Sequence, residues 1–281
     1  MRPHHPNYER YVHLIDLAVK EDVGRGDVTT NAFIDERSDM TCSIVARQNC
    51  VISGARIARD VFHFISQDIA VQCHIKDGEH AVDRDVVLSL SGNARHILKA
   101  ERIALNFMSY LSGIASLTAQ CVDAVKHTST HILDTRKTLP AYRDLAKYAV
   151  RCGGGKNHRM RLDDGVMLKD NHIAVAGNIQ QAVMQARACV PALTKIEVEC
   201  DTIEQVKEAI TAQADVIMLD NMDNTTMREA VELVARRIPL EASGNMTLER
   251  LPEVAETGVD FISLGALTHS VKAVDFGLDV M

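Results

Sequence analysis

Apolar residues in the first third of the chain change from a helical to a strand-like spacing. Between residues 11 and 19 they recur every three or four positions, which predicts an amphipathic helix. IARDVFHFI at 57–65 predicts a second helix. Short strand-like runs lie on either side of it: CSIVA (42–46), VISG (51–54) and VVLSLSG (86–92). Residues 1 to about 95 therefore read as a mixed α/β segment.

A long amphipathic stretch from about Ala94 to Lys126 follows this segment. Its apolar residues keep to one face of a helix. Gly113 lies within the stretch and is expected to kink or divide the helix. We expect this helix to link a small N-terminal domain to a larger C-terminal one.

The second half of the chain has a different pattern of apolar and polar residues, in which short apolar runs end in a polar residue or glycine. Helix-like segments lie between most of these runs, and the last four runs begin about 21 to 23 residues apart. Alternating strands and helices at this spacing predict a parallel sheet. The six runs are HILD (131–134), VMLKD (166–170), KIEVE (195–199), VIMLDN (216–221), PLEASGN (239–245) and FISLG (261–265).

Polar or glycine residues follow the apolar part of all six runs. In a β/α barrel the active-site groups lie at the carboxyl ends of the strands. The pattern therefore predicts a β/α barrel, with room for fewer than eight strands. The end positions are the 134–137 turn, Lys169, Glu199, Asp220, Ser243 and Gly265.

Charge is distributed unevenly along the 281 residues. The net charge is −7, which argues against non-specific nucleic-acid binding. Residues 134–172 nevertheless carry nine Lys and Arg against five Asp, so the rest of the chain carries −11. A basic island in an acidic protein indicates a small anionic ligand in a pocket, and a solvated basic helix face is the alternative.

The first residues, the apolar runs and the cysteines indicate where in the cell the protein is expected. The first twenty residues lack the apolar core and cleavage site of a secretory signal. No apolar run approaches the roughly 18 to 20 residues that span a bilayer. The seven cysteines are scattered without a C-x-x-C pair. We therefore expect a cytoplasmic protein with reduced thiols and no membrane partner.

Two basic motifs are the first candidates for chemistry. Arg136 and Lys137 directly follow a predicted strand, where guanidinium and ammonium groups suit carboxylate or phosphate; a solvated turn is the alternative. In RCGGGKNHR (151–159), three glycines are expected to let backbone amides approach an anion, with His158 and Arg159 as a cationic pair. A plain flexible loop would explain the glycines alone. Neither a Walker loop nor G-x-G-x-x-G after a strand is present.

Acidic and small residues complete the candidate site. Glu199 and Asp220 end neighbouring strands, where they could bind magnesium or stabilise a positive charge; ionic locks across the barrel mouth are the alternative. EASGN (241–245) and SLGALTHS (263–270) are expected to present backbone N–H groups to a phosphate at helix N-termini, unless they are ordinary tight turns.

Taken together, the motifs resemble the quinolinate phosphoribosyltransferase family over nearly the whole chain. The series comprises EDVGRGDVTT (21–30), AERIALNFMSYLSGIAS (100–116), DTRKTLPAYRDLAKYAVRCGGGKNHR (134–159), MLKDNHI, IEVE, IMLDN, EASGN and GVDFISLGALTHS (258–270). The resemblance implies an α/β fold with an N-terminal, sandwich-like α+β domain and linking helix (1–112). It further implies an open seven-stranded α/β barrel (113–270) and a tail (271–281) that returns to the N-terminal domain.

The resemblance also implies an activity. It is the transfer of phosphoribosyl from phosphoribosyl pyrophosphate to quinolinate with decarboxylation, which gives nicotinate mononucleotide in NAD biosynthesis. Mg²⁺ is the implied cofactor, with Glu199 and Asp220 as its direct or water-mediated ligands. The implied assembly is a homodimer, with higher oligomers left open, in which Arg102 crosses into the neighbouring subunit's pocket.

Residue roles follow from the same resemblance. The implied catalytic residues are Lys137, Lys169, Glu199 and Asp220. The implied substrate-binding residues are Arg102, Thr135, Arg136, Lys137, His158, Arg159, Lys169, Glu199, Asp220, Ser243, Gly244, Asn245, Leu264, Gly265, Ala266 and His269. Departures from the family pattern, at Ala141 and over 160–165, fall outside these residues.

Three other interpretations are open on the sequence. A relative associated with molybdate transport genes would share the fold but use another base, although the NHR and KDNH motifs favour quinolinate. A catalytically silent anion-binding protein would keep the charges without the reaction. A barrel aldolase would use Lys169 to form a Schiff base.

Overall fold

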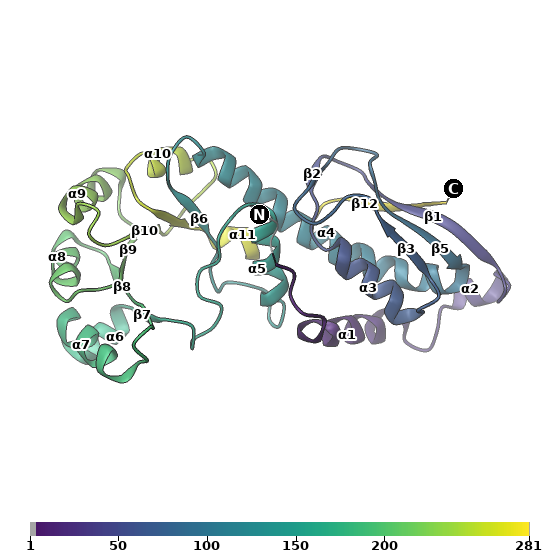
Figure 1. Cartoon of the computed structure of the whole chain (residues 1–281), viewed down its shortest axis with the longest axis horizontal. Coiled ribbons are helices and arrows are strands. Elements are labelled where there is room, and N and C mark those ends of the chain that lie inside the picture. Colours follow the sequence, from purple (N-terminus) through teal and green to yellow (C-terminus); the bar gives the residue numbers. More distant parts are fainter. Residues whose placement is uncertain (1–3, 281) are drawn as a thin grey trace. The chain divides into compact units, whose positions relative to one another are not determined.

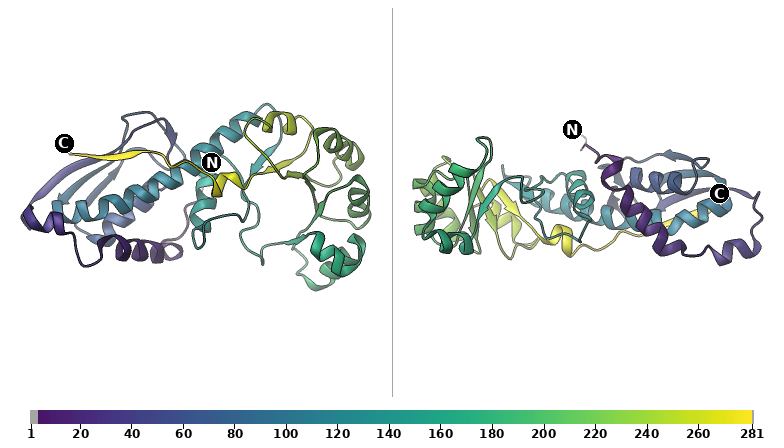
Figure 2. Two further views of the ribbon diagram at one scale, coloured as in Figure 1. Left: turned by 180° about the vertical axis from the view of Figure 1, so that it is seen from behind. Right: turned by 90° about the horizontal axis from the view of Figure 1, so that it is seen from below.

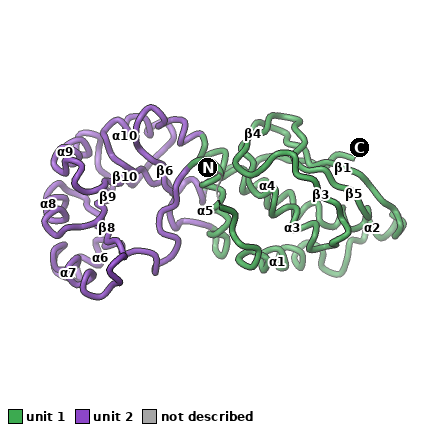
Figure 3. Tube along the Cα trace, in the orientation of Figure 1, with its two compact units in different colours: residues 1–119, 139–154, 270–281 green, residues 120–138, 155–269 purple. Residues whose placement is uncertain are grey.

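The structure, a computed structural model, describes residues 4–280 and divides into two compact units (Figure 3). Unit 1 comprises residues up to 119, residues 139–154 and residues from 270 onward; unit 2 comprises 120–138 and 155–269. The expected domain boundary at 112/113 falls inside a helix, and the 139–154 segment belongs to unit 1. Residues 1–3 and 281, at the ends of the expected ranges, lie outside the described residues.

Unit 1 contains a four-stranded antiparallel sheet in the order β12-β1-β5-β3 (Figure 1). In its central pair Ile44 lies opposite Leu88, and both side chains are fully buried. The last strand joins this sheet beside the first, so the end of the chain completes a sheet made by its first hundred residues. The strands are β1 (Asp39–Ala46), β3 (Ala70–Cys73), β5 (Val86–Asn93) and β12 (Phe276–Val280), and a separate pair joins β2 (Cys50–Val51) to β4 (His80–Ala81).

Helix α4 (Ala94–Val125) is the longest helix of the described chain. It runs unbroken through Gly113, so the expected division of the helix there is wrong. Gly113 instead makes room for the backbone before β12, because a Cβ atom at this position would lie 2.4 Å from the Lys272 carbonyl oxygen. The other helical elements of unit 1 are a 3-10 turn (Tyr8–Arg10), α1 (Val12–Val23), α2 (Val28–Phe33), α3 (Ala55–Ile65) and α5 (Arg143–Cys152).

Unit 2 is built on a parallel sheet in the order β6-β11-β10-β9-β8-β7. Each of the six apolar runs of the second half coincides with one of these strands to within a residue or two at its ends, which confirms that part of the prediction. Apolar residues such as Val198 and Ile217 are fully buried, as a sheet covered by helices requires. The strands are β6 (His131–Leu133), β7 (Val166–Leu168), β8 (Ile196–Cys200), β9 (Val216–Asp220), β10 (Leu240–Ser243) and β11 (Phe261–Ser263).

A single parallel bridge between Leu133 and Lys156 extends the sheet on the free side of β6. The Lys156 N–H donates to the Ile132 carbonyl over 2.8 Å. The described sheet thus has six strands and this single bridge, where the family resemblance implies seven strands. Among residues 4–280 no backbone ladder joins β7 to β6, so the sheet is an open one.

Helices follow the strands of unit 2, and α7, α8 and α9 lie on the outer side of the curved sheet (Figures 1 and 2). Local sequence fixes where two of them begin. Thr202 and Gln205 form a capping box before α8, and the Asp223 side chain accepts the Thr226 N–H at the start of α9. The helices are α6 (Asp170–Ala176), α7 (Ile179–Cys189), α8 (Ile203–Thr211), α9 (Asn224–Val234), α10 (Leu251–Ala255) and α11 (Ala266–His269). None of the described helices is long and apolar enough to cross a membrane.

Candidate active site

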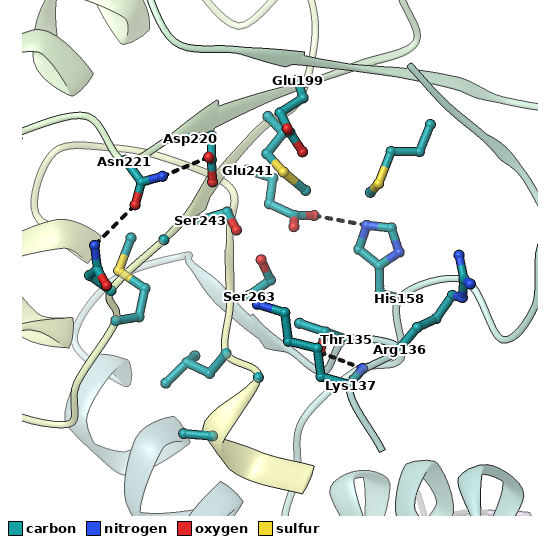
Figure 4. Close-up of a pocket in the computed structure, with 18 of the residues that line it drawn as sticks. Thr135, Arg136, Lys137, His158, Glu199, Asp220, Asn221, Glu241, Ser243 and Ser263 are labelled. Carbon is teal, nitrogen blue, oxygen red and sulfur yellow. Dashed lines mark hydrogen bonds and ion pairs between the residues drawn. The ribbon is translucent and has the colours of Figure 1, made fainter. Parts of the chain in front are cut away.

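A cavity of about 590 Å³ opens at the carboxyl ends of the parallel strands of unit 2 (Figure 4). Fifteen of the sixteen expected substrate-binding residues line it, which is the arrangement expected of a β/α barrel. Arg102 does not line it and lies on α4 in unit 1. Lining residues absent from that expectation are Met167, Met218, Asn221, Glu241, Met246 and Ser263.

The turn after β6 carries Thr135, Arg136 and Lys137. One hydrogen bond within the turn and one from α11 hold its backbone. Within the turn, the Lys137 N–H donates to the Thr135 hydroxyl over 3.1 Å. From α11, the Thr268 hydroxyl donates to the Lys137 carbonyl over 2.7 Å. The Lys137 side chain passes Gly265, where a Cβ atom would come within 3.1 Å of the lysine Cδ. These hydrogen bonds fix the backbone of the turn that carries the two cationic side chains.

Buried Asp134 organises the loop that carries Arg159. Its carboxylate accepts the His158 N–H over 2.9 Å and also accepts the Asn157 side-chain amide. The Arg159 guanidinium donates to the Gly165 carbonyl over 2.9 Å. Burial, followed by the positive charge of Arg136, lowers the pKa of Arg159. The structure thus holds two guanidinium groups near one another on one wall, an arrangement that an anion would stabilise.

His158 lies between this loop and two buried glutamates on the strands, Glu197 and Glu241, of which Figure 4 shows Glu241. Its Nδ1 accepts the Arg159 backbone N–H over 2.7 Å, and its Nε2 lies 3.0 Å from Glu197 Oε2 and 3.4 Å from Glu241 Oε2. The ring thus joins the Arg159 backbone to the two acids. The expected cationic pair of His158 and Arg159 stays a prediction, and in the structure His158 supports the backbone of Arg159.

Glu197 and Glu241 form a buried pair that the sequence reasoning missed. Burial, followed by the negative charge of Glu197, raises the pKa of Glu241. Oε1 of each glutamate has no hydrogen-bond partner. A signal for both residues did exist in the sequence. Glu197 precedes Glu199 by two positions on β8, and Glu241 precedes Ser243 by two on β10, so each shares a face of its strand with a recognised site residue.

Two groups of side chains could hold a cation. Glu199 and Asp220 line the open cavity with hard oxygen atoms, the ligands that Mg²⁺ prefers, and therefore fit a metal shared with substrate phosphates. One Glu199 oxygen is already bound by the Lys169 ammonium, and Asp220 Oδ2 accepts from the Asn221 amide over 2.7 Å. Ligand atoms of His158, Glu197 and Glu241 also lie within 4.8 Å of one another, although hydrogen bonds to the His158 ring account for their proximity.

Two glycine-containing turns also line the cavity. Gly265 directly precedes α11, as expected for a turn at a helix N-terminus. The turn of Ser243, Gly244 and Asn245 is different, because α10 begins only at Leu251. Gly244 and Asn245 instead adopt left-handed backbone conformations, with φ of 90° and 49°. The expectation of a helix N-terminus is thus wrong for this turn.

The glycines of 153–155 do not line the cavity, so their expected role in binding an anion is wrong. Gly153 ends α5 and packs directly against α4, where a Cβ atom would lie 2.3 Å from the Ala115 carbonyl oxygen. Gly154 makes the left-handed turn that follows, with φ of 88°. Close helix packing explains Gly153, and a tight turn explains Gly154.

Comparison with known proteins identifies the family to which the chain belongs. The family model for the quinolinate phosphoribosyl transferase N-terminal domain matches residues 27–112, and the model for the C-terminal domain of the same enzyme matches residues 114–279. A probable nicotinate-nucleotide pyrophosphorylase [carboxylating] of Bacillus subtilis is 43% identical over 274 residues, covering 98% of this chain and 94% of its own.

A second relative and a solved structure, both named as the same enzyme, also match nearly the whole chain. The nicotinate-nucleotide pyrophosphorylase [carboxylating] of Mycobacterium leprae is 41% identical over 272 residues, covering 95% of both chains. The structure of the nicotinate-nucleotide pyrophosphorylase from Francisella tularensis superposes with a TM-score of 0.95 at 36% identity, covering 98% of each chain.

Proposed function

Because this chain belongs to the quinolinate phosphoribosyltransferase family, we propose that the cavity of unit 2 binds quinolinate against Arg136 and Arg159 and phosphoribosyl pyrophosphate against the opposite wall. The reaction transfers phosphoribosyl to quinolinate with decarboxylation and produces nicotinate mononucleotide for NAD biosynthesis. The observation that carries the assignment is that two interacting guanidinium groups, acidic residues and glycine turns line one cavity. Figure 4 shows Arg136, Glu199 and Asp220 in this cavity.

The cationic wall suits a dianion. Quinolinate carries two carboxylates on adjacent ring carbons, and guanidinium groups bind carboxylates through paired hydrogen bonds. Asp134, His158 and the Gly165 carbonyl fix the loop that carries Arg159. Fixed cations hold the ring in one orientation, which presents its nitrogen to the second substrate.

The opposite wall suits phosphoribosyl pyrophosphate. The ring nitrogen attacks the anomeric carbon as the bond to pyrophosphate breaks, and positive charge develops on the ribose. We propose that Asp220 and Glu199 stabilise this charge, while Lys137 and Lys169 bind departing phosphate oxygens. The turns at 243–245 and 264–266 present backbone N–H groups to the remaining phosphate. Once the ring nitrogen is quaternary, it accepts the electron pair released as carbon dioxide leaves, and a proton replaces the lost carboxylate.

We propose Mg²⁺ as the cofactor, held by Glu199 and Asp220 directly or through water. The ion would neutralise negative charge on the pyrophosphate leaving group. The Lys169 Nζ already contacts a Glu199 carboxylate oxygen. A Schiff-base lysine would have to leave this contact to attack a carbonyl, so the contact disfavours the aldolase alternative.

We further propose a homodimer in which the partner subunit's Arg102 completes the dicarboxylate site. The proposal rests on the family resemblance of the ERIALN motif. A cytoplasmic location likewise stays a prediction.

Incubation with quinolinate, phosphoribosyl pyrophosphate and Mg²⁺ tests the function. Nicotinate mononucleotide and carbon dioxide should form in equal amounts, and Arg159→Ala should form little of either. A folded wild-type protein that forms neither product would refute the assignment. Borohydride reduction with a carbonyl substrate gives a separate test of the aldolase alternative, and covalent trapping at Lys169 would favour it.

A further inference from the structure

We propose that Asn221 is a positioning residue that holds the Asp220 carboxylate and the 243–245 turn in a fixed relationship. Asn221 directly follows β9 and lines the cavity. Its backbone N–H donates to the Ser243 carbonyl over 3.0 Å, which extends the pairing of β9 with β10 beyond the Asp220–Ser243 pair. The residue therefore lies where the acidic group and the glycine turn meet.

Both ends of the Asn221 carboxamide are used. Its Nδ2 donates to Asp220 Oδ2 over 2.7 Å, and its Oδ1 accepts from Asn245 Nδ2 over 3.1 Å (Figure 4). The first bond fixes one oxygen of the carboxylate. The second bond ties the turn to the same side chain. Only a carboxamide offers a donor and an acceptor on one short side chain, because a carboxylate has no donor and serine is too short to span both partners.

The backbone around this side chain is shaped to accommodate it. Asn221, Gly244 and Asn245 all adopt left-handed conformations, with φ of 55°, 90° and 49°. Asparagine tolerates this region better than most residues that have a Cβ atom. At Gly244 a Cβ atom would lie 2.2 Å from Asn221 Oδ1, so the glycine leaves the space that the carboxamide fills. Three unusual conformations meeting at one side chain indicate a site that is held in place for function.

The consequence for the reaction rests on the proposed function, which assigns phosphoribosyl pyrophosphate to the side of the cavity that carries Asp220 and the 243–245 turn. Loss of the carboxamide frees both the Asp220 side chain and the turn. Binding of phosphoribosyl pyrophosphate should therefore weaken, while quinolinate, which contacts the arginine wall, should bind as before. A purely structural role would instead lower stability without distinguishing between the substrates.

Asn221→Gly tests this inference, because glycine keeps the left-handed backbone and removes only the carboxamide. We expect the KM for phosphoribosyl pyrophosphate to rise about tenfold, as for the loss of two hydrogen bonds, with the quinolinate KM unchanged. Asn221→Asp keeps the acceptor for Asn245 but loses the donor to Asp220, and it should raise the same KM. Calorimetric binding of nicotinate mononucleotide without metal should weaken in both variants, because the product carries the phosphate that the turn holds.

Gln213→Gly is the matched control. Gln213 also has a left-handed backbone (φ 58°), is exposed, and does not line the cavity. Its substitution should leave both KM values unchanged. Wild-type KM values in both Asn221 variants, or an equal rise for both substrates, would overturn the inference. Failure of the proposed function is a separate outcome, since the wild-type protein would then form no nicotinate mononucleotide.

Discussion

His158 Nε2 lies 3.0 Å from Glu197 Oε2, while Nδ1 of the same ring accepts the backbone N–H of Arg159. The buried acid pair on β8 and β10 is thus connected to the backbone of the arginine loop through one imidazole ring. This relationship separates the residues that we propose to contact a dianionic substrate from residues that hold those contacts in place. The burial of the acid pair should also make the stability of the protein depend on pH.

The protonation of Glu241 should make stability depend on pH. Burial, followed by the Glu197 charge, raises the pKa of Glu241 from 4.5 to about 8. The folded protein keeps this proton while the unfolded chain releases it, so stability falls as pH rises through that interval. Glu241→Gln has no proton to lose and should flatten the fall, measured by urea unfolding at several pH values. The exposed Glu229→Gln is the control, and an unchanged slope in Glu241→Gln would contradict the account.

Glu199 and Asp220 should act on turnover more than on quinolinate binding. If they organise Mg²⁺ and stabilise the developing ribose cation, Glu199→Gln and Asp220→Asn should lower kcat on the order of tenfold or more. The quinolinate KM should change little, and circular dichroism should show an intact fold. If both variants keep the wild-type kcat at saturating Mg²⁺, the two acids have no role in turnover and serve only as ionic contacts in the cavity wall.

Gly153 should matter for stability. A Cβ atom there would meet the Ala115 carbonyl at 2.3 Å and the Thr118 Cβ at 2.6 Å. Gly153→Ala should therefore cost about 1–3 kcal/mol in the free energy of unfolding, measured by urea denaturation. Gly165→Ala is the control, because its nearest neighbour would be the Lys195 carbonyl at 3.8 Å. Equal stabilities of the two variants would show that α5 and α4 separate readily.

Subunit mixing tests the proposed shared site. Arg102→Ala and Arg159→Ala should each be nearly inactive as homodimers. Random exchange of equal amounts gives half heterodimers, each with one intact pocket, so activity should recover to about a quarter of wild type. Exchange demonstrated by mass spectrometry without any recovery would mean that Arg102 acts within its own subunit or only in folding.

The strand ends could be predicted from the sequence because both their apolar core and their polar ends are local patterns. Glu199, Asp220 and Ser243 end successive strands, and parallel pairing brings those ends together. Arg136 and Arg159 could be found in the same way, as basic residues in loops at that edge.

The remaining features depend on contacts that local pattern does not encode. Glu197 and Glu241 lie inside strands, where a charge is uncommon, and their shared face becomes meaningful only once His158 lies between them. The role of Gly153 depends on how closely α4 approaches. The role of Asn221 depends on the turn from the neighbouring strand.

Comparison of quinolinate with nicotinate tests the central claim most directly. Nicotinate lacks the second carboxylate and would leave part of the Arg136–Arg159 wall unpaired. A site built to pair a substrate group rejects the analogue without that group by about 10⁴-fold or more. We therefore predict a kcat/KM for quinolinate that exceeds the value for nicotinate on that order. Comparable values for the two substrates would contradict the assignment of this cavity to a dicarboxylate.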